Sequence, residues 1–137
     1  MFHDKQVCQN SGMHSEPTAA RSYRGFSPEQ RRAERRTRLI AAAIAVYGER
    51  GYRQATVKAV CEAAGLTERY FYESFENSEQ LLITSFNAVT YAVFDEMSLA
   101  ARTAGRGRAA RARAMLDAYF SALQRSPASA RVYLVEI

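Results

Sequence analysis

The sequence predicts an all-α protein, for three reasons. Apolar side chains recur every three or four residues in the segments that follow residue 26, which is the period of one helix face. Most of these segments begin at a serine, threonine or asparagine and several end near a glycine, the residues that cap helices. The chain has 137 residues, 47% hydrophobic and 24% charged, a composition typical of a folded globular protein.

The first predicted helix follows a polar segment. Residues 1–26 are rich in polar side chains and are expected to form a flexible tail. Ser27 is the expected N-cap, because Pro28 suits the first helical turn and Gln30 completes a capping box. The helix should run for about 22 residues to Gly51, with arginines in its front half and apolar side chains in its back half.

Two short helices are predicted next. Thr56 is a good N-cap for a helix that ends at Ala64, and Gly65 can supply the left-handed turn after it. Thr67 is then expected to cap a second helix that reaches Phe75. Together with the first helix they make a three-helix unit over residues 27–76.

This pair of short helices has the design of a helix-turn-helix. Its expected inner side chains are Val57, Val60, Cys61, Ala64, Leu66, Phe71 and Phe75. The second helix carries hydrogen-bonding side chains on its other side, which suit base edges and phosphates: Thr67, Glu68, Arg69, Tyr70 and Tyr72. The alternative is a compact helix pair that is only part of an all-α core.

The distribution of charge also places a binding surface in the N-terminal part of the chain. The net charge is +5, and residues 21–38 hold seven arginines against two glutamates, whereas residues 76–100 hold four acids and no base. A basic front part indicates a polyanion-binding surface there. A further five arginines lie in residues 101–113, where a solvated loop and helix face is favoured over a second nucleic-acid patch.

Residues 77–137 are predicted to form the first helices of a regulatory domain. Asn77 or Ser78 should cap a long helix, which Gly105 and Gly107 end. Helical spacing resumes over residues 112–123, and Ser126 and Pro127 begin a last helix over residues 128–137. Its apolar run has no polar exit, so we expect the fold to continue past Ile137 or another segment to cover this end.

Five aromatic and methionine side chains in these later helices are candidates for a ligand cavity: Tyr91, Phe94, Met97, Tyr119 and Phe120. Ordinary core packing is the favoured alternative for them. Cys61 is expected to be a small buried side chain. Cys8, with His3 and His14, gives only a weak metal pattern, and we expect no metal or cofactor.

The sequence predicts neither an enzyme nor a membrane protein. Both histidines lie in the tail, and no nucleophile–base, paired-carboxylate or phosphate-loop arrangement is evident, so we expect no catalysis. No apolar run is long enough to span a bilayer, and the first 26 residues lack the apolar core of a signal peptide. We therefore expect a cytoplasmic protein.

Four motifs make the chain resemble the TetR family of transcription regulators. They are the Ala-Ala-x-x-x-Tyr-x-x-x-Gly-Tyr segment of residues 42–52, the Thr-Val-x-x-Val-x-x-x-Ala-Gly block of residues 56–65, the pair Tyr72 and Phe75, and the Glu-x-Leu-Leu segment of residues 79–82. The resemblance is strongest over residues 35–86. Relatives usually continue through further helices that form the dimer interface.

The resemblance implies a homodimer that binds a near-palindromic double-stranded DNA operator and releases it when a small-molecule effector enters the helical second domain. By analogy, Thr67, Arg69 and Tyr70 lie nearest the bases, and Thr56 and Tyr72 contact phosphates. Val57, Lys58 and Glu68 lie on the same surface. Arg31, Arg35 and Arg36 are expected at the backbone as well.

One position departs from the family pattern. Many relatives carry a phosphate-contacting lysine where this sequence has Ser78, so that contact is lost or replaced by the serine hydroxyl and the helix N-terminus. The alternative to a repressor is a helical ligand-binding or protein-interaction module with a non-functional DNA-binding head.

Overall fold

The computed structural model describes residues 25–136 of the chain. Over this range the fold is all-α, as predicted. Its helices are α1 (Pro28–Arg50), α2 (Val57–Ala64), α3 (Glu68–Ser74), α4 (Ser78–Thr103), α5 (Arg108–Arg125) and α6 (Pro127–Val135). The expectations for residues 1–24, with the pattern of His3, Cys8 and His14, and for Ile137 lie outside the described residues.

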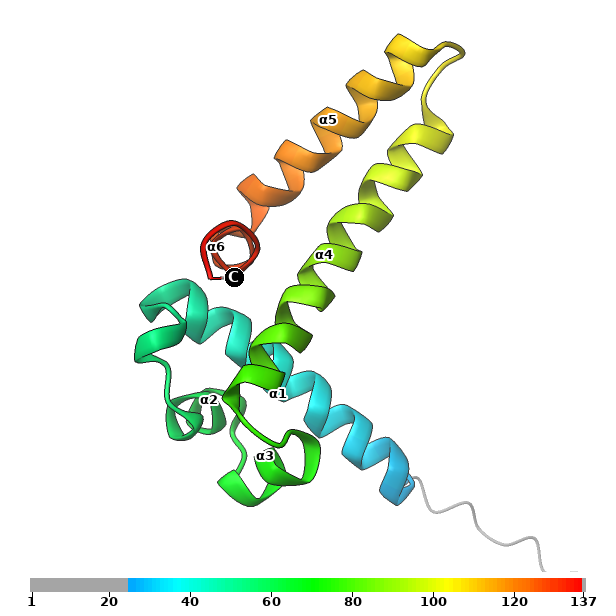
Figure 1. Ribbon diagram of the computed structural model, residues 1–137. Coiled ribbons are helices and arrows are strands. Elements are labelled where there is room, and N and C mark those ends of the chain that lie inside the picture. The colour runs from blue at the N-terminus through cyan, green and yellow to red at the C-terminus, as the bar shows by residue number, and fades with distance from the viewer. Residues whose placement is uncertain (1–24, 137) are drawn as a thin grey trace, which may run out of the picture.

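The helices form two connected parts (Figure 1). We call α1 to α3, residues 28–75, the head, and α4 with α5, residues 78–125, the hairpin. In Figure 1 the hairpin extends away from the head, and α6 lies between the base of the hairpin and α1. The two parts are thus joined by a helix that touches both.

Local sequence signals explain where α1 and α2 begin. The Ser27 backbone N–H donates to Gln30 Oε1 at 2.7 Å, and the Gln30 N–H donates back to Ser27 Oγ at 3.1 Å, which is the predicted capping box. Thr56 Oγ1 accepts from the Ala59 N–H at 3.1 Å at the start of α2. These reciprocal bonds satisfy backbone donors that would otherwise lack a partner.

The turn between α2 and α3 is also as predicted. Gly65 adopts φ 63° and ψ 38°, the left-handed conformation that a side chain would strain. Thr67 is the N-cap residue of α3, as predicted, but its side chain makes no capping hydrogen bond. The backbone instead starts the helix, with the Tyr70 N–H donating to the Thr67 carbonyl at 3.0 Å.

Helix α4 ends at Thr103, shortly before Gly105, as predicted, whereas two other features differ from the sequence expectation. A short 3₁₀ turn, Tyr52–Gln54, was not predicted. Helix α5 begins at Arg108, four residues before its apolar pattern, because alanine and arginine favour helix without any apolar periodicity. Helix α6 starts at Pro127 with Ser126 as its N-cap, as predicted, and ends at Val135.

The core lies where α1, α2, α3, α4 and α6 meet. Its most deeply buried members are Leu39, Ala43, Tyr47, Val60, Phe71, Phe75, Leu81 and Val132. Cys61 is buried as expected, and burial raises the pKa of its thiol. Val57 and Leu66 are only partly buried, so they pack at the edge of this core rather than inside it. No helix in the described range is long and apolar enough to cross a membrane.

Helix α6 is attached to the end of α1 in two ways. Gly48 of α1 lets the helices approach so closely that a Cβ there would lie 2.3 Å from the Cβ of Ala128. Beyond the helix, Glu136 Oε2 accepts from the Tyr52 backbone N–H at 2.9 Å, and its Oε1 accepts from Arg131 Nε at 3.0 Å. The second part of the chain is therefore held to the head near Gly51.

Candidate nucleic-acid interface

Helix α3 presents one face to the core and the other to solvent. Phe71 is fully buried, whereas the Arg69 side chain is 83% exposed and Tyr72 is 60% exposed. Thr67 and Glu68 are exposed too, and Tyr70 is half-buried. The left-handed turn at Gly65 thus directs α3 so that its polar side chains project outward, as the sequence predicted.

Arg35 of α1 lies against the outer side of α3. Its guanidinium carbon is 4.3 Å from the centroid of the Tyr70 ring, within the range of a cation–π contact. Its Nη2 is also 3.7 Å from Glu73 Oε2. Arg35 is therefore half-buried in contacts between α1 and α3 and is not a freely projecting cation.

Arg36 and Arg38 hold the C-terminal ends of the two short helices. Arg36 Nη1 donates to the Ser74 carbonyl at 2.6 Å, and its guanidinium lies over the Phe75 ring. Arg38 Nη2 donates to the Ala64 carbonyl at 2.6 Å. Cations are favoured at helix C-termini, where carbonyls lack partners. Arg36, predicted at the DNA backbone, thus has an internal structural contact.

Arg38 was missed by sequence reasoning, and the reason is physical. A basic residue near a helix C-terminus is recognisable when both lie in the same helix. Here the arginine and the carbonyl are 26 residues apart, so only the packing of α1 against α2 brings them together.

A polar pocket of about 400 Å³ lies between the front of α1 and α3. Its lining residues are Pro28, Arg31, Arg32, Arg35, Arg69, Tyr70 and Glu73. Four arginines against one glutamate make the pocket strongly basic, a charge balance that suits a phosphate. The structure thus brings four predicted site residues of α1 and α3 together: Arg31, Arg35, Arg69 and Tyr70.

The remaining predicted site residues lie outside this pocket. Thr56 and Lys58 are exposed at the start of α2, where Lys58 Nζ lies 4.0 Å from Glu62 Oε1. Val57 and Ser78 are half-buried at the first positions of α2 and α4. The first turns of two helices thus carry these four residues, next to backbone N–H groups that can bind anions.

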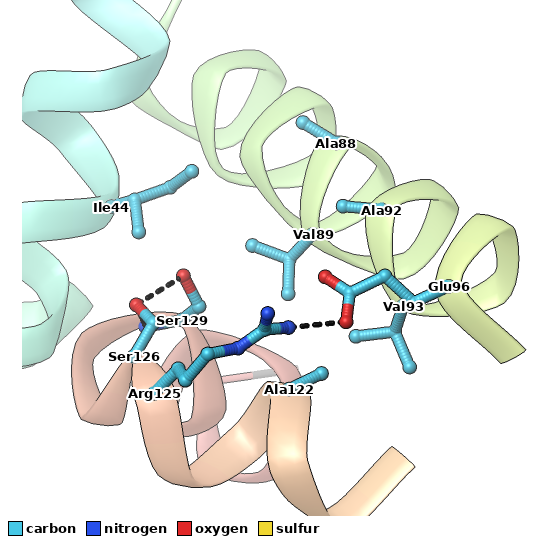
Figure 2. Close-up of a pocket in the computed structure, with 10 residues that line it drawn as sticks. All are labelled: Ile44, Ala88, Val89, Ala92, Val93, Glu96, Ala122, Arg125, Ser126 and Ser129. Carbon is cyan, nitrogen blue, oxygen red and sulfur yellow. Dashed lines mark hydrogen bonds and ion pairs between the residues drawn. The ribbon is translucent and has the colours of Figure 1, made fainter. Parts of the chain in front are cut away.

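A second, mostly apolar pocket of about 320 Å³ lies at the junction of α1, α4, α5 and α6 (Figure 2). Ile44, Val89 and Val93 form part of its apolar wall, and Arg125 pairs with Glu96 across from α5 to α4. Ser126 Oγ donates to Ser129 Oγ at 2.8 Å beside it.

The five predicted ligand-cavity residues are not among those that line this pocket. Tyr91, Phe94 and Phe120 are more than half exposed, so they lie neither in this cavity nor in the core. Met97 and Tyr119 are partly buried and pack against the core. The described residues contain no cluster of three or more histidine, cysteine or acidic side chains that could hold a metal ion.

A helix-turn-helix with a polar, outward-facing second helix defines a class of DNA-binding regulators. Comparison with known families gives the same class. Residues 39–84 match the model of the family described as bacterial regulatory proteins, tetR family. Residues 39–84, which contain the helix-turn-helix, therefore resemble the DNA-binding domain of TetR-family transcription regulators.

Two solved structures are similar in fold. One is the fatty acid degradation regulator FadR from Bacillus halodurans, with 24% identity and a TM-score of 0.70 over 82% of this chain. The other is a protein assigned as a transcriptional regulator of Pseudomonas aeruginosa PAO1, with 26% identity and a TM-score of 0.56 over 78%. The chain spans 56% and 51% of their respective lengths. No curated protein matches it.

Proposed function

We propose that the chain is the DNA-binding part of a cytoplasmic repressor that a small-molecule effector releases from its operator. The observation that carries the proposal is the orientation of α3, whose Arg69 and Tyr72 project into solvent while Phe71 anchors the helix in the core. A helix held in this way can enter the major groove without unfolding.

The residues of the interface divide into two roles. Thr67, Arg69 and Tyr70 read base edges, because they lie on the outer face at the start of α3. Thr56, Tyr72, Arg31 and Ser78 hold phosphates, and Val57, Lys58 and Glu68 border them. Arg35 supports Tyr70 through its cation–π contact. Arg36 supports the end of α3, and the part of its guanidinium that stays exposed faces the DNA backbone in the proposed complex.

The effector enters the pocket at the junction of α1, α4, α5 and α6. Its walls are mainly alanine, valine and isoleucine side chains, with the Arg125–Glu96 pair and two serines among the lining residues, so a mostly apolar effector of modest size that carries a polar group fits best. Because Ile44 of α1 and Val89 of α4 both line it, a ligand there pushes on the helix that carries the head and on the helix that follows α3.

Repression requires two copies of the chain. A near-palindromic operator is read by a homodimer whose two α3 helices sit about 34–36 Å apart in successive major grooves. A shift of α4 relative to α1 changes that spacing and releases the DNA. Effector and operator affinities are then coupled reciprocally, so an effector that lowers operator affinity binds more weakly when DNA is present.

The first prediction concerns Arg69 and Tyr72. A duplex is selected from random sequences by the wild-type chain, and binding is followed by fluorescence anisotropy. Arg69→Ala should cost about 1–3 kcal/mol at this duplex and relax one base preference. Tyr72→Phe should weaken all duplexes alike by about 1 kcal/mol.

Arg111→Ala is the matched control, because Arg111 is an exposed arginine of the hairpin far along the chain from the head. It should leave binding unchanged. Binding by wild type should also fall by orders of magnitude between about 50 and 200 mM salt. If neither Arg69→Ala nor Tyr72→Phe changes the affinity for DNA, or if the affinity does not depend on salt, the result favours a protein-interaction module instead.

A further inference from the structure

The carboxylate of Glu73, on α3, bridges two arginines with its two oxygens. Glu73 Oε1 accepts from Arg69 Nε at 3.3 Å, one helical turn away. Glu73 Oε2 lies 3.7 Å from Arg35 Nη2, whose guanidinium rests on the Tyr70 ring. Glu73 therefore ties an exposed arginine of α3 to a half-buried arginine of α1.

The contact to Arg69 engages only one edge of its guanidinium. The Arg69 Nε–H donates to Glu73. Within residues 25–136 this is the single hydrogen bond of the Arg69 side chain. Its terminal Nη1 and Nη2 groups remain available as a planar fork of donors. That fork matches the N7 and O6 acceptors of guanine in the major groove.

An acid in this position has a cost for DNA binding. Glu73 lies in the same basic pocket as Arg31, Arg32 and Arg69, so its charge offsets part of their attraction for phosphate. An arginine side chain has many rotamers, and fixing one of them in advance lowers the entropy lost on binding. The acid thus weakens binding to any duplex while it favours one orientation of Arg69.

We propose that Glu73 is a positioning residue that determines sequence specificity: it holds Arg69 in the orientation that reads one guanine of the operator. This inference rests on the proposed function. Glu73 itself touches no base. It acts through Arg69, and it is fixed in turn by Arg35 from α1.

The test measures base preference and overall affinity separately. The duplex selected by wild type is compared with duplexes in which each base pair is replaced in turn, and with an unrelated duplex. For wild type, one guanine replacement should weaken binding tenfold or more, and Arg69→Ala should abolish that penalty. This pair of measurements identifies the base that Arg69 reads.

Glu73→Ala should reduce the penalty at that guanine to less than about threefold and strengthen binding to the unrelated duplex several-fold. Glu73→Gln keeps a side-chain oxygen that can accept from Nε, so it should retain most of the guanine preference. Thermal unfolding midpoints of both variants are measured to verify that the head folds. If the alanine variant does not fold, Glu73→Leu takes its place, because leucine keeps most of the side-chain volume and has no atom that can accept from Arg69 Nε.

Glu62→Ala is the matched control for charge. Glu62 is an exposed acid of α2 whose ion pair is with Lys58, and its removal changes the net charge of the head by the same amount. It should strengthen binding to all duplexes equally and leave the guanine penalty intact.

The inference is overturned if Glu73→Ala keeps the full guanine penalty, or if Glu62→Ala lowers it equally. Retention of the penalty by Glu73→Ala would leave the proposed function standing, because wild type would still select a site read by Arg69. If wild type selects no sequence at all, the proposed function fails and this inference fails with it.

Discussion

The head and the hairpin use the same kinds of side chain in opposite ways. In the head, Phe71 and Phe75 are at most 2% exposed and pack against each other with ring centroids 5.8 Å apart. In the hairpin, Tyr91, Phe94 and Phe120 are all more than 55% exposed, and α5 has no fully buried residue. Helical periodicity produced both arrangements.

The difference comes from the number of helices that meet. Three helices of the head cross one another and are covered by the start of α4, so the inward-facing rings of Phe71 and Phe75 are surrounded on all sides. In the hairpin α4 and α5 run side by side, so each helix buries one face and leaves another outward. An aromatic residue at helical spacing is therefore not by itself evidence of a core.

The largest predicted effect tests this contrast directly. Phe71→Ala removes a fully buried ring and leaves a cavity between α1 and α3, so it should lower the free energy of unfolding by about 3–5 kcal/mol. Phe120→Ala removes a ring that is 57% exposed and should change stability by about 0.5 kcal/mol or less. Urea denaturation of both variants provides the measurement. Comparable losses would mean that the ring of Phe120 is covered in solution.

A smaller effect is expected where α6 joins the two parts. Gly48→Ala places a Cβ within 2.4 Å of the Ala128 backbone, so α6 must shift away from α1. We expect a loss of about 1–3 kcal/mol. The control is Gly105→Ala in the hairpin, where no atom lies within 4 Å of the added Cβ. It should be neutral or slightly stabilising. The thermal unfolding midpoints of the two variants provide the measurement. A Gly48→Ala protein as stable as wild type would contradict the close approach of α6 to α1 at Gly48.

The smallest effect depends on pH. The Tyr52 backbone N–H, followed by Arg131, lowers the pKa of Glu136 below its ordinary value of 4.5. The ionised carboxylate therefore stabilises the folded state above that value, and this contribution disappears as the pH falls through the lowered pKa. Glu136→Gln should cost about 1 kcal/mol at neutral pH, and the difference from wild type should shrink as the pH falls from about 6 to 3.

Glu49→Gln serves as the control for the pH experiment, because Glu49 is an exposed acid of α1 beside Arg50. Its unfolding profile should follow wild type throughout. A difference between Glu136→Gln and wild type that stays constant across the acid range would show that the carboxylate of Glu136 has no stabilising contact with Tyr52.

Much of the fold could be predicted because its signals are local. The capping box at Ser27, the cap at Thr56 and the turn at Gly65 each depend on residues within a few positions of one another. The outward face of α3 could be predicted for the same reason, since Phe71 and Arg69 lie on different sides of one short helix. The sequence did not reveal that the Thr67 side chain makes no capping hydrogen bond. At that position only the backbone carbonyl accepts, from the Tyr70 N–H.

The candidate site was only partly predictable. Arg31, Arg69 and Tyr70 were chosen by residue type and position, and packing then placed them around one pocket. The internal contacts of Arg35 and Arg36 and the contribution of Arg38 arise between helices. The apolar periodicity of the hairpin was compatible with a cavity at Tyr91 and Phe94, and the packing of α4 on α5 left both exposed.

The sequence by itself determined the helices, the left-handed turn at Gly65 and the polar face of α3, because caps, glycine conformation and side-chain period act over one or two turns of chain. Tertiary structure alone decided which arginines remain exposed and which support the head, because their carbonyl, ring and carboxylate partners lie 26 to 39 residues away or on another helix. Contacts across that separation depend on how helices pack, and no local pattern encodes them.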